Sequence, residues 1–165
     1  MSPVSTRVAI AVISLAFGAH STAAKPFDRR IVDTVEVGNP VSETNHGYVG
    51  ADATTGVTDG ISYRQARGYM RYAMKTFDDT PLSVACTFVG SANESLNYEL
   101  VVEDSVIATK TLKTPSVEPV VVEIAVPFAI TKGRTNVAII IRARDGMTPA
   151  LRSLRTVQDH NELQQ

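Results

Sequence analysis

A strict alternation of apolar and polar residues is the feature of this sequence that most restricts its fold. In residues 82–89, for example, Leu82, Val84, Cys86 and Phe88 share one face and smaller or polar residues share the other. Such a period of two places one face of a β-strand in a core and the other toward solvent. The same alternation recurs in residues 96–102, 120–126 and 137–144. Further strand candidates, rich in Val, Ile, Thr and Tyr, are 31–37, 69–76, 106–112 and 151–157.

Turn-forming residues separate these segments. The sequence Glu-Asp-Ser at 103–105 is short enough to close a hairpin between 96–102 and 106–112. About eight strands, with no long amphipathic helix, predict an all-β fold. We therefore expect one antiparallel β-sandwich of jelly-roll type.

One stretch departs from the strand-and-turn rhythm. Residues 38–60 hold five of the ten glycines of the chain, together with Asn39-Pro40 and Asn45-His46. A long connection without secondary structure of its own is usually functional or disordered. We expect this loop to lie over one end of the sandwich, where a ligand surface would be built.

The first residues predict the compartment. Residues 1–24 combine a short charged start, an apolar run of about a dozen residues and the small Ala23-Ala24 pair before Lys25. The alternative is a membrane anchor, but spanning a bilayer takes about 20 apolar residues. We therefore predict a signal peptide at 1–24, a β-sandwich domain at 25–157 and a flexible tail at 158–165, in a secreted or periplasmic protein.

Charge and cysteine content exclude several classes of protein. The formal net charge of −1 does not provide the excess of positive charge that binds nucleic acid or an anionic membrane. No segment after residue 24 is apolar enough to span a membrane. Cys86 is the one cysteine, so an intramolecular disulfide is excluded. Because Cys86 falls on an apolar strand face, we expect a small buried hydrophobe.

Several blocks of residues, in order, resemble the C-terminal β-sandwich domain of glycoside hydrolase families 127 and 146, the β-L-arabinofuranosidase-like enzymes. The block YRQARGYMRY at 63–72 is similar to a Trp-Arg-x-Ala…Gly-Trp-Phe-x-Tyr element of that family. The other blocks are 43–47, 86–91, 98–112, 126–127 with 131–133, and 142–144.

The resemblance implies an accessory or substrate-binding module without the upstream helical barrel that carries catalysis in those enzymes. It also implies two partners: a plant-type glycan such as an arabinose-containing polymer, and a separately encoded glycoside hydrolase. The chain lacks tryptophan, and Val89 stands where the family often has one. Since aromatic faces commonly hold sugar rings, the resemblance supports the fold more strongly than it supports sugar binding.

The densest polar and aromatic cluster is the candidate site. Arginine can donate paired hydrogen bonds, and tyrosine offers a flat face and a hydroxyl group. The alternative is that the tyrosines pack at a sheet edge, that the arginines hold the long loop, and that the histidine ring bonds a backbone carbonyl. The hypothesised carbohydrate-binding residues are His46, Tyr63, Arg64, Arg67, Tyr69 and Tyr72.

No cofactor is implied, although loop carboxylates at Asp52, Asp59, Asp78 and Asp79 leave a structural calcium open. A glycosidase needs two carboxyl groups about 5–10 Å apart. The candidates Glu94, Glu99, Glu103, Glu118 and Glu123 show no such pairing in the sequence. The sequence therefore favours a secreted non-catalytic carbohydrate-associated module. A secreted structural or protein-interaction sandwich and a small enzyme are the alternatives.

Overall fold

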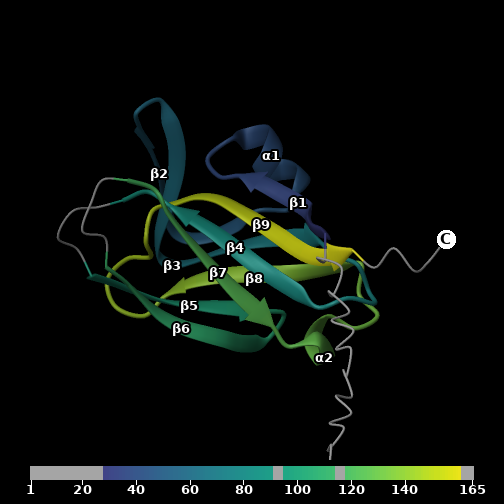
Figure 1. Cartoon of the computed structure of the whole chain (residues 1–165). Helices are drawn as coiled ribbons and strands as arrows, with labels where there is room; N and C mark the ends of the chain where they lie inside the picture. Colours follow the sequence, from purple (N-terminus) through teal and green to yellow (C-terminus); the bar gives the residue numbers. More distant parts are fainter. Residues whose placement is uncertain (1–27, 91–94, 114–117, 161–165) are drawn as a thin grey trace, which may run out of the picture.

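A computed structural model describes residues 28–90, 95–113 and 118–160. The described chain folds into strands with two short helices between them (Figure 1). The elements are β1 (Asp28–Glu36), α1 (Pro40–Asn45), β2 (Val49–Thr58), β3 (Ile61–Lys75), β4 (Leu82–Phe88), β5 (Ser95–Val102), β6 (Ser105–Lys113), β7 (Val120–Val126), α2 (Phe128–Thr131), β8 (Asn136–Ala143) and β9 (Leu151–His160).

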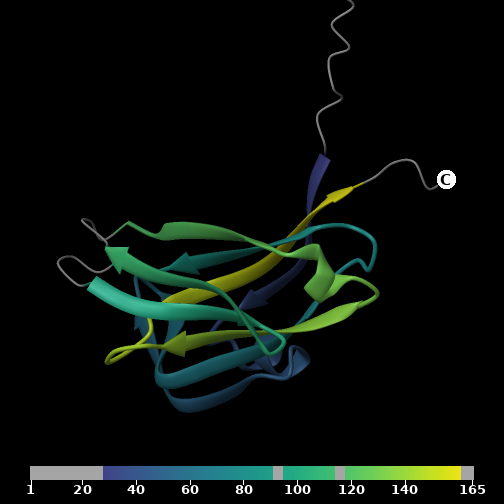
Figure 2. The same ribbon diagram turned by 90° about the horizontal axis from the view of Figure 1, so that it is seen from below.

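The strands form two layers. One sheet has the order β2-β3-β8-β5-β6 and the other has the order β1-β9-β4-β7. The two layers face each other in Figure 2. They are joined by a bridge between β3 and β9, where Arg64 pairs with Leu151. All of the strand pairings are antiparallel, which confirms the predicted β-sandwich.

The core fills the space between these layers, and the alternation of the sequence explains which side chains enter it. Leu82, Val84, Cys86 and Phe88 of β4 are all 0–1% exposed, as the alternation predicts. The Phe88 ring meets Tyr98 of the opposite sheet edge-on, with ring centroids 5.2 Å apart. The side chains that alternate toward the inside thus form the apolar core between the two sheets.

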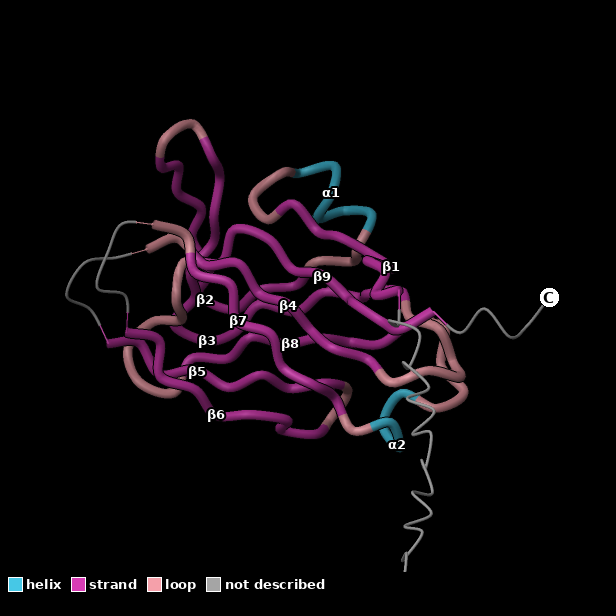
Figure 3. The backbone as a smooth tube through the Cα atoms, in the orientation of Figure 1, coloured by secondary structure: helices cyan, strands magenta, loops and turns pink. Residues whose placement is uncertain are grey.

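The hairpin predicted around 103–105 is also confirmed, since β5 and β6 pair from Ser95↔Lys113 to Val102↔Ser105. The expectation of a long loop at 38–60 is wrong. This stretch contains α1 and β2, and β2 pairs with β3 along its whole length (Figure 3). No residue of β2 is buried. Its alternating apolar residues, Val49, Ala51, Ala53 and Val57, are small, so the alternation is weaker than in the other strands.

The end of the chain also differs from expectation. β9 runs through His160, and Gln158 is 1% exposed, so the tail boundary predicted at Gln158 falls inside this strand. β1 pairs with β9 from Asp28↔His160 onward, so the two ends of the described chain lie side by side. The predicted signal peptide lies outside the described residues. Within those residues, no helix has the length and apolar character needed to cross a bilayer.

Candidate functional site

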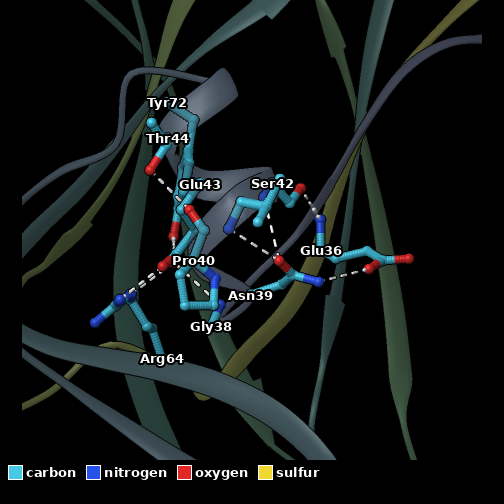
Figure 4. Close-up of polar contacts among 10 residues, drawn as sticks. Glu36, Gly38, Asn39, Pro40, Ser42, Glu43, Thr44, Arg64 and Tyr72 are labelled. Atoms are coloured by element: carbon cyan, nitrogen blue, oxygen red, sulfur yellow. Dashed lines mark hydrogen bonds and ion pairs between the residues drawn. The ribbon is translucent and has the colours of Figure 1, made fainter.

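Arg64, the central residue of the predicted site, is bound to the carboxylate of Glu43. Arg64 lies on β3 and Glu43 on α1, and both the Nε and the Nη2 groups of Arg64 donate to this carboxylate at 2.6 Å (Figure 4). The backbone N–H of Gly38 donates to the same carboxylate at 3.0 Å, and the Tyr72 hydroxyl donates to it at 3.3 Å. The Arg64 guanidinium also stacks on Tyr48, 4.4 Å from the ring centroid.

The electrostatics of this cluster are those of a closed ion pair. Burial by itself would raise the pKa of Glu43, but the Arg64 and Gly38 hydrogen bonds and the Arg64 charge outweigh burial and lower it. The hydrogen bond from Arg64 to Glu43 in turn raises the pKa of Arg64. The pKa of Tyr72 is strongly raised, first by burial and then by the neighbouring Glu43 charge. Each partner therefore holds the other in its charged form, and Tyr72 stays a neutral donor.

The local sequence explains why α1 sits here. Asn39 caps the helix, because its side chain accepts hydrogen bonds from the backbone of Val41 at 3.0 Å and of Ser42 at 3.2 Å. Gly38 has a φ of 81° and touches the hairpin between β2 and β3. A Cβ atom at Gly38 would lie 2.7 Å from the Cβ of Ser62. The glycine thus lets the start of α1 pack against the β2–β3 hairpin.

His46 takes the structural role that was its alternative in the sequence analysis. Its Nδ1 lies 2.6 Å from the Ser42 carbonyl and its Nε2 lies 3.1 Å from Asp33 Oδ1. Burial would raise the pKa of Asp33, but hydrogen bonds from the Lys75 backbone and from His46 lower it. His46 thereby ties the end of α1 to β1.

The remaining predicted residues do not join this cluster. Tyr63 lies one position from Arg64 on β3, and Tyr69 lies three positions from Tyr72. Because side chains alternate along a strand, both tyrosines point away from Glu43. The Tyr63 ring instead lies against Gly56 on β2, where an added Cβ would be 2.3 Å from the ring. Arg67 is exposed. Arg64 and Tyr72 therefore share one face of β3, and Tyr63 and Tyr69 lie on the other. The role of all six residues in sugar binding stays a prediction.

A groove that sequence reasoning missed lies on the outer face of the β1-β9-β4-β7 sheet. Its volume is about 560 Å³. The floor follows a register row, Glu36↔Ser153↔Thr87↔Val121, which crosses all four strands. The turn before α1 and the tip of the β2–β3 hairpin form its rims. A smaller hollow of about 250 Å³ lies beside Arg64, between Pro40, Thr44 and Tyr48.

Three of the candidate glycosidase carboxylates, those of Glu99, Glu103 and Glu123, each form an ion pair with an arginine. Glu99 binds Arg142 at 2.9 and 2.5 Å, and Glu123 binds Arg29. Glu94 lies outside the described residues. In residues 28–90, 95–113 and 118–160, no group of three or more His, Cys, Asp or Glu side chains is placed to hold a metal ion. Two of the calcium candidates have a positive φ: Asp52, at the register shift in β2, with 51°, and Asp59, in the turn between β2 and β3, with 52°.

The fold is shared with carbohydrate-binding modules. A family 35 module from Clostridium thermocellum superposes with a TM-score of 0.54 at 8% identity, covering 78% of this chain and 97% of that one. The family 35 module of Cellvibrio japonicus Abf62 gives a TM-score of 0.54 at 13% identity, covering 81% and 99%. A family 115 4-O-methyl-α-glucuronidase with specificity for decorated arabinogalactans, BtGH115A, gives 0.56 at 12% identity, covering 86% of this chain and 19% of the enzyme.

The chain itself belongs to the DUF6805 family, described as a family of unknown function, whose model matches residues 26–157. No curated protein matches the sequence.

Proposed function

We propose that this protein is a secreted, non-catalytic module that binds a plant-type glycan. The groove on the outer face of the β1-β9-β4-β7 sheet is the observation that carries the proposal. Its volume of about 560 Å³ falls within the ~300–1,000 Å³ typical of small-ligand sites. The β-sandwich shared with family 35 carbohydrate-binding modules supports the same function.

The lining of the groove suits a sugar. Ser153 and Thr87 offer hydroxyl groups on the floor, and Asn39 offers an amide at the rim. Val121 and Ile61 add apolar surface that can cover the C–H face of a sugar ring. A ligand here would be held by hydrogen bonds and aliphatic contacts, in place of the aromatic stacking common at sugar sites.

Within this function, an arabinose-containing polymer is the proposed ligand and a separately encoded glycoside hydrolase the proposed partner. The resemblance of 63–72 and the other blocks to the accessory domain of families 127 and 146 supports both. Because BtGH115A is specific for decorated arabinogalactans, arabinogalactan is included among the polymers to be tested for binding.

Affinity gel electrophoresis of the purified protein tests the proposal. We expect retardation in gels that contain arabinan or arabinogalactan. A Thr87→Leu, Ser153→Leu double variant removes the two floor hydroxyls and should weaken retention roughly tenfold or more. Thr109→Leu, at an exposed position on β6 in the other sheet, is the matched control and should bind like the parent protein.

A structural or protein-interaction module is the second candidate. It is favoured by exposed aliphatic residues, since Val41, Val57 and Val121 are 71%, 64% and 65% exposed. Absence of retention on every arabinose-containing polymer, with the protein folded, would replace the first candidate by this one.

Export is part of the proposal and has its own test. The sequence of residues 1–24 supports cleavage before Lys25. N-terminal sequencing of protein recovered outside the cytoplasm should begin at Lys25. An intact Met1 on all of the recovered protein would contradict export through this signal.

A further inference from the structure

A β-bulge in β9 turns a charged side chain toward the groove. β4 residues Thr87 and Phe88 pair with Ser153 and Leu151, so Arg152 is the extra residue that faces no partner on β4. In a strand without a bulge, the side chains of Arg152 and Ser153 would point to opposite faces of the sheet. Bulges re-aim side chains in this way and recur next to functional sites. Arg152 is half-buried and lines the groove.

Arg155 brings a second positive charge to the same groove. It follows Ser153 on the outer face of β9, in register with Thr34 of β1 and Ala85 of β4. Within the described residues, neither Arg152 nor Arg155 has a side-chain hydrogen bond or an ion pair. Arg29, on the same sheet, is by contrast bound to Glu123 and lies 3.6 Å from Asp159.

One acidic side chain lines the groove beside these arginines. The Glu36 carboxylate accepts a hydrogen bond from the Asn39 amide at 3.3 Å, at the rim formed by the start of α1. The lining therefore carries two guanidinium groups against one carboxylate. An excess positive charge without protein partners, set among hydroxyl groups, is suited to an anionic and polyhydroxylated ligand.

We infer that the groove selects an acidic glycan and that Arg152 and Arg155 bind carboxylate groups of its uronic acid residues. The inference rests on the proposed glycan-binding function and names the class of sugar. The planar guanidinium fork matches a carboxylate with two parallel hydrogen bonds. Glu36, Ser153 and Thr87 are then left to bind the neutral hydroxyl groups of the same polymer.

The test compares one polymer in two chemical forms. Affinity electrophoresis uses a glucuronic-acid-bearing arabinogalactan and the same polymer after its carboxyl groups are reduced to alcohols. We expect binding to the acidic form to be at least roughly tenfold tighter. Dextran sulfate, run in parallel, distinguishes sulfate recognition from carboxylate recognition.

Single substitutions assign the effect to the groove. Arg155→Gln and Arg152→Gln should each weaken binding to the acidic polymer by roughly tenfold and leave binding to the reduced polymer unchanged. Lys110→Gln removes the same charge from an exposed position on β6 and should have no effect. Because neither arginine has a partner in the described chain, thermal melts of both variants should match the parent protein.

Each outcome separates the two proposals. Equal binding of the acidic and reduced polymers would overturn the selection for acidic sugars and leave the glycan-binding function standing. Dextran sulfate bound as tightly as the acidic glycan would overturn the assignment to carboxylates. Binding to none of the three polymers, nor to neutral arabinan, would overturn both proposals.

Discussion

At the scale of single residues, the Glu43 carboxylate depends on Arg64. The Glu43 side chain is 4% exposed and that of Arg64 is 18% exposed. Arg64→Ala should therefore leave a buried carboxylate without its cation and reduce the free energy of unfolding by about 3 kcal/mol, as measured by urea denaturation. Arg67→Ala, an exposed neighbour on β3, should change it by less than about 0.5 kcal/mol. An Arg64→Ala protein with parental stability that no longer binds glycan would support the prediction that Arg64 is a binding residue.

The same residues predict how stability depends on pH. The folded-state pKa values of Glu43 and Asp33 are lowered, so the unfolded chain binds protons first as the pH falls. Their contribution is fully present above the unfolded-state pKa of about 4, and it is lost as the pH falls through the lower folded-state values. The unfolding free energy should be flat from about pH 7 to about pH 5 and then fall. Glu43→Gln should show a shallower acid limb, and an identical limb would assign the fall to other groups.

At the scale of elements, residues 38–60 show what sequence patterns found and missed. β2 lies at the edge of its sheet and buries none of its side chains, so its apolar period rests on small residues and on only two valines, Val49 and Val57. Local signals were nevertheless present. Asn39-Pro40 has the composition of a helix N-cap followed by proline in the first turn. Asp59-Gly60 forms the hairpin turn with φ of 52° and 75°, the conformation that favours Asp-Gly.

Gln158 holds the end of β9 to the connection between β3 and β4. Its amide oxygen accepts from the Thr76 hydroxyl at 3.0 Å and the Phe77 N–H at 2.6 Å, and its amide nitrogen donates to the Thr80 carbonyl at 2.8 Å. Gln158→Ala would leave these groups unpaired, so the melting midpoint should drop by an amount equivalent to about 2 kcal/mol. Asn136→Ala, an exposed amide on β8, is the control. Equal melting of the two variants would mean that water replaces the lost bonds.

At the scale of the whole molecule, the fold could be predicted from the sequence and the proposed groove could not. Alternation in segments such as 82–89 and 137–144 specifies two-faced strands, and this was enough to predict a sandwich. The groove depends on something else, the register by which Glu36, Ser153, Thr87 and Val121 meet across four strands. The Glu43–Arg64 contact likewise joins an α1 residue to a β3 residue. Both depend on tertiary contacts between segments that are separated in the sequence, which no local pattern reports.

The Cys86 thiol makes it possible to measure how often the two sheets separate. It is the one thiol of the chain, it is 0% exposed, and burial raises its pKa to about 12. Since only the thiolate reacts readily, a thiol reagent near neutral pH should label Cys86 only when the sheets separate. Its labelling rate should then follow global unfolding.

Arg64 stands at the β3–β9 bridge that joins the sheets, so Arg64→Ala should raise this rate by roughly a hundredfold for a loss of about 3 kcal/mol. Arg67→Ala should leave the rate unchanged. A large loss of urea stability in Arg64→Ala without faster labelling would show that α1 detaches alone while the sandwich stays closed around Cys86. The two measurements together therefore decide whether the Glu43–Arg64 pair stabilises one helix or the whole fold.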